Sequence, residues 1–440
     1  MESYLSDRQI QYTISHLMDV VGIESEYSSS RNKVYVDGIV IEFSLMSSDS
    51  VQRMLYGFEP ICEVPAFDGN AQIPIFGTPN GDFSEVQGNT LIIHADILTY
   101  SFLLLSGKAD MLLGKPDMNG RVSYRGSLQE KYHTIDLPIV DEYAMLLRKE
   151  ILYAFPNVEI KKRKPQLIPT HDVDTAIRYG TFCRNVKTII GGDLILRKSP
   201  RLAMRSFIEA VKVKRGIIED PLIDACYQLE ALSKKNKLQS LFFFLGYDRA
   251  DKDFRYDCRN PKVAFMMRKL EEENAIIGLH GGVGTSDNER LLMKQKKRVE
   301  KAYGRDIAAS RQHYLAFSPE KTPLVWKHIG IKDDYTLSYH DHEGFRCGTC
   351  HPYKLYDLTK DEELCVIEHP LIVMDGTLRG YRRLSTQDAL QKVRKLYHQT
   401  ERTEGDFVIL WHNGSVIREW SEWYKDVYVE FFKMPRMRSE

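Results

Sequence analysis

From Gln166 onward, short apolar runs alternate with longer segments that carry apolar residues at helical spacing. The apolar runs have the length of buried strands. They lie at 167–174, 238–248, 274–280, 310–317, 329–336 and 407–413, and helical segments between them include 221–237, 261–273 and 288–303. Regular alternation of this kind predicts a parallel sheet, either open or closed into a barrel.

Chemically reactive side chains gather at the ends of these apolar runs. Asp172, Asp174, His280, Asp333, Asp334 and His412 lie at the carboxyl ends, and Arg311 and His313 lie near the start of the fourth run. In α/β folds the ligand site is built from the carboxyl ends of the strands, because the strands converge there and the loops are free to vary. We therefore expect these side chains to form one pocket.

The first run, LIPTHDVD, ends in two aspartates that are one residue apart. Strand side chains alternate between faces, so Asp172 and Asp174 should point the same way, and His171 and Val173 the other way. Two neighbouring carboxylates repel each other unless a cation or a proton is present. The pair therefore predicts a metal site or an acid–base site, with a helix N-cap as the structural alternative.

Residues 1–160 have a different organisation and predict a smaller α/β domain. This region combines an amphipathic stretch (9–21), strand-like alternation (33–45), an apolar patch (89–107) and a helical stretch (140–155). A basic run at 161–164 follows, and we interpret it as a solvated linker. The predicted domains are thus 1–160, of unknown role, and 166–440, a barrel.

Charge and cysteine content exclude several classes of protein. Lysine plus arginine equals aspartate plus glutamate at 61 each, so no overall field favours nucleic acid or an anionic membrane. The chain has no apolar run near the roughly 18 residues of a membrane span, and it does not begin like a secretion signal. Seven scattered cysteines fit reduced thiols. We expect a cytoplasmic protein without nucleic-acid partners, and its oligomeric state stays open.

Five stretches in a fixed order resemble the polysaccharide deacetylase family, the NodB-homology domain of carbohydrate esterase family 4. They are THDVD (170–174), IGLH (277–280), SRQHYL (310–315), DYTLSYHDHEGFRCGT (334–349) and LWHN (410–413), so the resemblance covers about 166–420. The stretches FLLLSG, NGR (119–121) and PIVDEYAMLL (138–147) resemble the domain that precedes such catalytic domains in a bacterial subgroup. This resemblance implies a distorted (β/α) barrel with fewer than eight strands.

The resemblance also implies a role for each matching residue. Asp172 would be the general base and Arg311 would orient it. Asp174 and His280 would bind a divalent metal, with zinc expected, and His412 would be the general acid. Such a site suits amide hydrolysis, because a metal acidifies water and polarises a carbonyl while a carboxylate and an imidazole move protons. The substrate would be an N-acetylated sugar of a surface glycan or its precursor, and Trp411 and Tyr339 would contact it.

The sequence departs from the family pattern at one metal-binding position. The family has a second histidine four residues after the first, whereas this chain has Gly284 there. Catalytic zinc usually has three protein ligands, so Asp174 and His280 need a third. His313 is our candidate, with Asp172, Thr285 or water as the alternatives.

Other functions are compatible with parts of the pattern. A member of the same fold that has lost catalysis could bind a glycan or a protein partner without metal. The two aspartates also suit a metal-dependent glycosyltransferase. His171 with Asp172 and His280 could instead belong to a metal-dependent phosphoesterase or amidohydrolase.

The sequence Cys347-Gly-Thr-Cys350-His351 has the spacing of a c-type haem attachment site, and Cys365 with His369 could complete a zinc site. We interpret these cysteines as ordinary loop residues, because the chain shows no export signal and no second axial-ligand region.

Overall fold

The computed structural model describes residues 3–23, 26–57, 61–78, 82–180, 185–248, 251, 253–417 and 421–434. Its amino-terminal part combines helices with a mixed five-stranded sheet of order β1-β2-β3-β7-β6 and a separate β4-β5 pair. Its elements are α1 (Asp7–Val21), β1 (Ser28–Ser30), β2 (Lys33–Val36), β3 (Ile39–Phe43), α2 (Ser48–Tyr56), β4 (Cys62–Pro65), β5 (Gln72–Ile75), β6 (Ser84–Gln87), β7 (Thr90–Ile93), α3 (Ile97–Leu105), α4 (Lys108–Leu113), α5 (Leu128–Lys131) and α6 (Ile139–Ala154).

Helix α3 is the central apolar element of the amino-terminal part. All of its residues are buried, which explains why this stretch of the sequence is uniformly apolar. Its Phe102 ring lies 6.1 Å from the ring of Tyr12 in α1 and 5.3 Å from that of Tyr356 in the larger sheet. Helix α3 therefore packs on both parts of the chain.

The remaining residues build a nine-stranded sheet of order β13-β14-β12-β11-β10-β9-β8-β16-β15. All of its strand pairs are parallel except β13 with β14. The strands are β8 (Gln166–Val173), β9 (Leu241–Leu245), β10 (Ile276–Gly281), β11 (Ala309–Gln312), β12 (Asp333–Asp334), β13 (Tyr353–Asp357), β14 (Glu362–Glu368), β15 (Leu371–Met374) and β16 (Asp406–Leu410).

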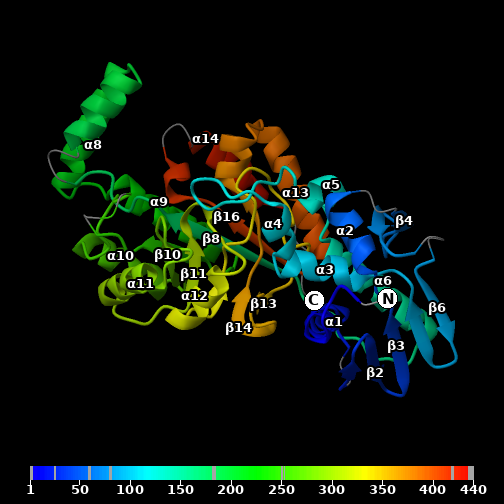
Figure 1. Cartoon of the computed structure of the whole chain (residues 1–440). Helices are drawn as coiled ribbons and strands as arrows, with labels where there is room; N and C mark the ends of the chain where they lie inside the picture. Colours follow the sequence, from blue (N-terminus) through cyan, green and yellow to red (C-terminus); the bar gives the residue numbers. More distant parts are fainter. Residues whose placement is uncertain are drawn as a thin grey trace.

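Helices connect the parallel strands and cover the sheet (Figure 1). The longer ones are α8 (Pro200–Lys214), α9 (Pro221–Lys235), α10 (Pro261–Glu272), α11 (Glu289–Tyr303), α12 (Thr322–Ile329) and α13 (Thr386–Arg402). Shorter helical segments are η1 (Lys187–Leu196), η2 (His313–Leu315), η3 (Thr377–Tyr381), η4 (Asn413–Val416), α14 (Ser421–Trp423) and η6 (Tyr424–Val429). The alternation of strands and helices confirms the predicted α/β class.

The large sheet curls strongly although its edges are not paired directly. Strand β14 lies next to one end of the sheet and β15 forms the other end, yet only two residues separate them in the chain. Two intervening residues span at most about 11 Å, so the two ends must lie close together. Leu337, which follows β12, also bridges the gap by accepting a hydrogen bond from the Leu371 amide at 3.2 Å. The sheet is a half-barrel compatible with the predicted distorted barrel.

Apolar side chains fill both faces of the curled sheet. Inside it, Phe243, Tyr335, Val408 and Leu410 form a buried cluster, and the larger core lies between the sheet and its helices. Asp172 is buried with this interior, whereas Val173 belongs to the outer core, as the alternation of strand side chains predicts.

The amino-terminal part packs against the barrel through buried and half-buried ion pairs. These link Asp110 with Arg346 (2.9 Å), Asp136 with Lys392 (2.6 Å), Glu142 with Arg402 (2.8 Å) and Arg148 with Glu404 (2.9 Å). The partners come from α13 and from the turns that follow α13 and β12. The division into two domains near residues 160–166 stays a prediction.

Within the described ranges, no helix combines the length and the apolar character that crossing a membrane requires.

Candidate metal centre and adjoining cleft

The structure brings together six of the eight residues that the sequence predicted to form one pocket. Asp333 instead pairs with His369. Asp334 accepts hydrogen bonds from Trp326 and Thr336, so these two aspartates lie outside the centre. All six lie at the carboxyl ends of neighbouring parallel strands. Asp172 and Asp174 are at the end of β8, His280 is in β10, Arg311 and His313 are at the end of β11, and His412 follows β16. Their roles in binding and catalysis stay predictions.

Asp172 and Arg311 form a fully buried ion pair inside the barrel. Arg311 Nη1 donates to Asp172 Oδ1 at 2.9 Å, and Arg311 Nε donates to the Tyr335 carbonyl at 2.7 Å. The guanidinium also lies over the Phe243 ring, 4.8 Å from its centre. Burial favours the neutral acid, yet attraction to His280 and Arg311 holds the pKa of Asp172 below its ordinary value. Asp172 is therefore ionised and fixed in orientation.

Asp174, His280 and His313 have the arrangement of metal ligands. Asp174 Oδ1 lies 3.4 Å from His280 Nε2 and 3.5 Å from His313 Nε2. Two ligand atoms on a tetrahedral zinc ion, each about 2.0–2.1 Å from it, lie about 3.3–3.4 Å apart. The three side chains thus have the spacing that one such ion needs.

Two of these ligand atoms have no other partner. Both Asp174 Oδ1 and His280 Nε2 are buried, and neither atom takes part in a hydrogen bond. The other ring nitrogen of His280 lies 2.9 Å from the Arg311 carbonyl, an acceptor, so Nδ1 carries the proton and the lone pair of Nε2 faces Asp174. Burial opposes ionisation, but in the absence of a cation a proton on His280 or His313 would supply the compensating positive charge, and this attraction holds the pKa of Asp174 well below its ordinary value. A divalent cation fits this anionic, unpaired set.

His313, the predicted third ligand, lies beside Asp174, and the backbone that follows it is strained. Tyr314 and Leu315, which follow it, have φ angles of 61° and 58°, a left-handed conformation that non-glycine residues rarely adopt. The Thr285 hydroxyl, considered as an alternative ligand, lies 2.7 Å from the Gly282 carbonyl and 2.8 Å from Gln312 Oε1 and is engaged there. Asp172 Oδ2, the other alternative, lies 3.6 Å from His280 Nε2.

His412 faces Asp172 from the last strand. Its Nε2 lies 4.0 Å from Asp172 Oδ2, and its Nδ1 donates to Asp375 Oδ1 at 2.6 Å. Burial lowers the pKa of a histidine, but attraction to Asp375 outweighs it and raises the pKa of His412 to about 10. The imidazole is therefore protonated at neutral pH.

The sequence analysis missed three charged residues of this centre. Asp375 follows β15, and the rule that polar residues at strand ends build the site would have identified it had the short run 371–374 been recognised as a strand. Arg255 lies 3.6 Å from Asp174 Oδ2, and Asp253 lies 3.6 Å from His313 Nδ1. No periodic pattern marks these two loop residues.

The structure corrects the predicted sugar-contacting role of two aromatic residues. Trp411 is fully buried, and its ring lies 4.8 Å from that of Tyr428. Tyr339 is 1% exposed, and its hydroxyl donates to Asp110 and Gln129. Both rings are enclosed by the protein core, so neither has a face free for a sugar.

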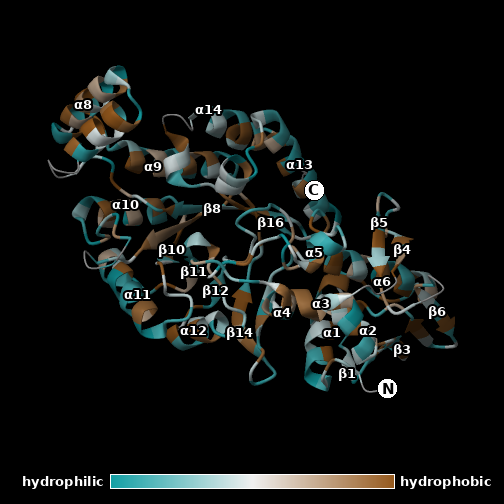
Figure 2. Ribbon diagram, turned by 45° about the horizontal axis from the view of Figure 1, so that its top comes forward, coloured by the Kyte–Doolittle hydropathy of each residue, from teal (hydrophilic) through white to brown (hydrophobic). Residues whose placement is uncertain are grey.

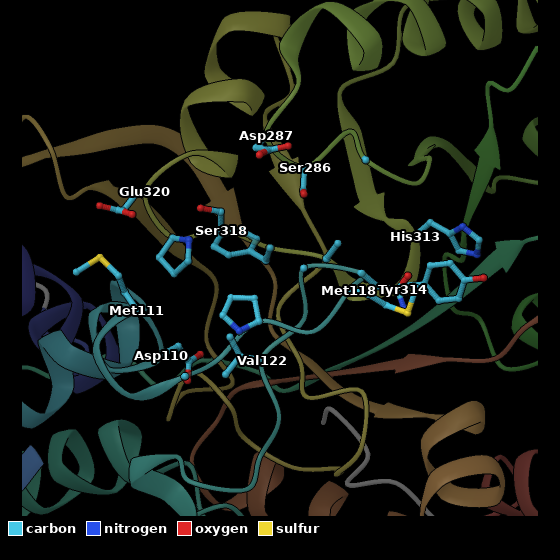
Figure 3. A pocket seen from close by; sticks show the side chains of 18 of the residues that line it. Asp110, Met111, Met118, Val122, Ser286, Asp287, His313, Tyr314, Ser318 and Glu320 are labelled. Carbon is cyan, nitrogen blue, oxygen red and sulfur yellow. The ribbon is translucent and has the colours of Figure 1, made fainter. Parts of the chain in front are cut away.

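A cleft of about 460 Å³ adjoins the candidate centre at His313 and Tyr314 (Figure 3). One wall comes from the amino-terminal part, between Asp110 and Val122, and the other from barrel residues 283–287 and 313–320. Tyr314 is 37% exposed, and its ring stacks on that of His313 at 4.0 Å. Among the described residues, acidic side chains line this cleft but no lysine or arginine does.

Comparisons with known proteins give one family match. A family of unknown function (DUF7033) matches residues 2–156, about a third of the chain. No curated protein matches.

Several solved structures are partly similar. One described as a polysaccharide deacetylase from Mycobacterium smegmatis is 16% identical, with a TM-score of 0.40, over 62% of this chain and 86% of that one. A mutant of a CE4 family pseudoenzyme with restored enzymatic activity is 11% identical, with a TM-score of 0.30, over 62% and 64%. A 4-alpha-glucanotransferase from Thermococcus litoralis is 15% identical, with a TM-score of 0.35, over 62% and 37%. The family match thus lies on the amino-terminal part, whereas the candidate centre lies between residues 172 and 412.

Proposed function

We propose that the chain is a metal-dependent carbohydrate N-deacetylase, which hydrolyses the N-acetyl amide of an amino sugar in a surface glycan or its precursor. The observation that carries the proposal is the combination of an acid–base pair with a set of unpaired ligand atoms. Asp172 and His412 lie 4.0 Å apart, and they adjoin Asp174 and His280, whose facing atoms have no hydrogen-bond partner.

Asp174, His280 and His313 would hold the metal. A divalent ion, zinc by its preference for this nitrogen and oxygen ligand set, supplies Lewis acidity to the amide carbonyl and acidifies water when bound. The half-buried carboxylate of Asp174 would contribute the negative charge that offsets the ion.

Asp172 and His412 would move the protons. Asp172, held ionised by Arg311, removes a proton from the attacking water as the oxygen–carbon bond forms. His412, held protonated by Asp375, donates its proton to the sugar nitrogen as the carbon–nitrogen bond breaks. Acetate and a free amino sugar leave, and the proton taken by Asp172 returns to solvent or to His412.

The cleft beside His313 would receive the sugar chain. The partly exposed ring of Tyr314 offers an apolar face next to the proposed metal ligands, and Ser286 and Ser318 offer hydroxyl groups. Because acidic residues line the cleft, a neutral or basic glycan suits it better than a phosphorylated one.

The test is acetate release from an N-acetylated chito-oligosaccharide by zinc-loaded protein. We expect turnover that a chelator abolishes and zinc restores. Asp172→Asn should reduce turnover by about 10²–10⁴-fold while zinc stays bound, because it removes only the base. The matched control is Asp306→Asn, at an exposed site, which should leave turnover unchanged. Full turnover by Asp172→Asn would refute the assigned base.

The second candidate is a glycan-binding or partner-binding protein with the same fold and no catalysis. Gly284, at a position where the family resemblance implies a metal-binding histidine, favours it. This candidate predicts glycan binding that a chelator does not affect, together with no acetate release at any metal loading.

A further inference from the structure

A helical hairpin projects from the barrel between β8 and α9. It consists of η1 and α8, and Figure 1 shows α8 extending away from the rest of the molecule. The base of the hairpin is fixed by Asp220, whose carboxylate accepts the backbone N–H groups of Arg178 at 2.9 Å, Tyr179 at 2.8 Å and Leu222 at 3.0 Å. The hairpin is therefore a defined projection on the carboxyl-end side of the sheet.

The two helices meet mainly through polar and small side chains, with the partly buried Ile189 of η1 packed beside Ala210 and Val213 of α8. The fully buried carboxylate of Asp193 accepts hydrogen bonds from Ser206 and, at 3.1 Å, from Arg197. The buried face of α8 consists of Ala203, Ser206, Ala210 and Val213. Such an interior buries little apolar surface, so the large apolar residues of the hairpin must lie elsewhere.

Those large apolar residues face outward. On α8, Met204, Phe207 and Ile208 are 62%, 56% and 46% exposed. With Val211 they have the spacing i, i+3, i+4, i+7 of one helix face. On η1, Ile195 and Leu196 are 62% and 82% exposed. In Figure 2 the projecting helix α8 carries hydrophobic as well as hydrophilic positions. A contiguous exposed apolar surface of this kind marks an interaction site.

The same hairpin is strongly basic. Residues 185–215 contain eight lysines and arginines against two acids, a net charge of +6, whereas the full chain has no net charge. On α8, Arg201, Arg205 and Lys212 fall on one face at helical spacing, directly beside the exposed apolar stripe. An apolar stripe flanked by basic residues is the pattern of a helix that lies in the interface of an anionic membrane.

We infer that the η1–α8 hairpin binds the surface of an anionic phospholipid membrane, with its apolar face in the acyl boundary and its basic residues at the head groups. Charge decides between this partner and a second copy of the chain. Two hairpins packed face to face would repel each other, because each carries a net charge of +6. Anionic lipids would instead neutralise that charge. This binding is independent of the proposed hydrolysis, and it would place the carboxyl edge of the barrel near glycans carried on lipid.

The experiment is co-sedimentation of the full-length protein with two kinds of vesicle. One is pure phosphatidylcholine, and the other contains about one third phosphatidylglycerol. We expect binding to the anionic vesicles that weakens with salt, and little binding to the neutral ones. Phe207→Glu with Leu196→Glu should reduce the affinity at least about tenfold, because both residues leave the acyl boundary. Arg201→Glu with Lys212→Glu should also reduce it at least about tenfold.

Matched substitutions on the other side of the molecule test specificity. Tyr153→Glu changes an aromatic residue of α6 that is 83% exposed, and Lys149→Glu with Lys162→Glu reverses two exposed charges. These variants should bind like the wild type. In addition, Phe207→Trp should retain binding and show a blue-shifted emission on anionic vesicles, whereas Tyr153→Trp should not.

Two outcomes would overturn the inference. Equal binding to both kinds of vesicle, or to neither, would exclude an anionic membrane as the partner. A dimer in light scattering without lipid, converted to monomer by Phe207→Glu with Leu196→Glu, would assign the hairpin to a second copy of the chain.

Discussion

Among the residues that the structure describes, two clusters contain residue types that bind metals, at the spacing that binding requires. One is Asp174, His280 and His313 at the carboxyl edge of the barrel, and the other is Asp141, Cys350 and His351 between α6 and the barrel. In each cluster the ligand atoms lie within 4.8 Å of one another. They differ in what those atoms already bind.

In the second cluster, hydrogen bonds engage the ligand atoms. Asp141 Oδ1 accepts the Thr349 hydroxyl at 2.5 Å, and Oδ2 accepts the Cys350 amide at 2.8 Å and its thiol at 3.1 Å. His351 Nε2 donates to the Thr403 carbonyl at 2.7 Å. Burial raises the pKa of Asp141 to about 7 and lowers the pKa of His351 to about 3. Protons and neutral hydrogen bonds hold this cluster together.

In the first cluster, by contrast, buried lone pairs face one another without donors. Leaving Asp174 Oδ1 and His280 Nε2 without partners costs free energy that a folded core normally avoids. The comparison shows that spacing alone does not identify a metal site. A site also needs ligand atoms that the protein has left unpaired.

The largest expected effect is on metal affinity, and it separates the two clusters directly. His280→Ala should weaken zinc binding at least about a thousandfold, since losing even an outer partner of a ligand costs about 10–100-fold. Cys350→Ser should leave zinc affinity unchanged. Competition titration with a chromophoric chelator gives both values, and His313→Asn provides a second ligand variant if His280→Ala folds poorly.

Loss of zinc from Cys350→Ser with retention in His280→Ala would reverse the assignment of the two clusters. Circular dichroism of each variant verifies that the fold is retained in both cases.

The next effect is on the pH dependence of stability, and it tests whether a proton holds the second cluster. The pKa of Asp141 is about 7 in the folded protein and 3.8 ordinarily, so folding takes up a proton between these values. The stabilisation that protonated Asp141 contributes is fully present below the unfolded pKa and is lost as the pH rises through about 7. As the pH rises from about 5 to about 8, ionisation of this carboxyl should lower the free energy of unfolding by about 2–3 kcal/mol.

Asp141→Asn should abolish that loss, because an amide keeps an acceptor for the Cys350 amide and carries no charge. Urea unfolding of both proteins at the two pH values measures the difference. If the wild type and the variant lose the same amount of stability between the two pH values, the proposed protonation of Asp141 is contradicted.

A smaller effect is expected from one hydroxyl of the second cluster. Thr349→Val removes the donor to Asp141 and the acceptor of the His351 amide, both buried, and should cost about 1–3 kcal/mol of stability. Thr359→Val, at an exposed site, is the control and should change stability by less than about 0.5 kcal/mol. A loss in the control as large as that in Thr349→Val would mean that the hydrogen bonds of the cluster contribute nothing specific.

Local patterns were sufficient to predict much of the barrel and its centre. The expected helix 261–273 is α10 at Pro261–Glu272, and the expected run 407–413 overlaps β16 at Asp406–Leu410. The shared orientation of Asp172 and Asp174 needs only the alternation of strand side chains. The carboxyl-end rule then places residues from distant strands in one centre.

Features that depend on long-range packing could not be predicted in this way. Trp411 is covered by Tyr424 and Tyr428, from segments after the last strand, so its burial is invisible in its own neighbourhood. The hairpin face of Phe207 has the periodicity of a core-facing helix, although nothing in the described part of the chain covers it. Periodicity indicates that a face is apolar but does not say what it contacts.

The smallest effect concerns Gly284, the position that the sequence marks as lacking a histidine. Gly284→His should change zinc affinity by less than about threefold, because in the proposed site His313 would already complete a three-residue ligand set of the usual size. The substitution should cost about 1 kcal/mol of stability, since the φ angle of 74° at this residue disfavours side chains, although the space around it is open.

Zinc titration of Gly284→His, alone and combined with His313→Ala, tests this. An affinity gain of tenfold or more in the single variant would show that His313 does not act as the third ligand in the wild type. If the single variant is neutral while the double variant binds more tightly than His313→Ala alone, the two positions can substitute for each other. That result would explain how the chain can keep a metal centre of the same composition with one histidine moved from the loop after β10 to the end of β11.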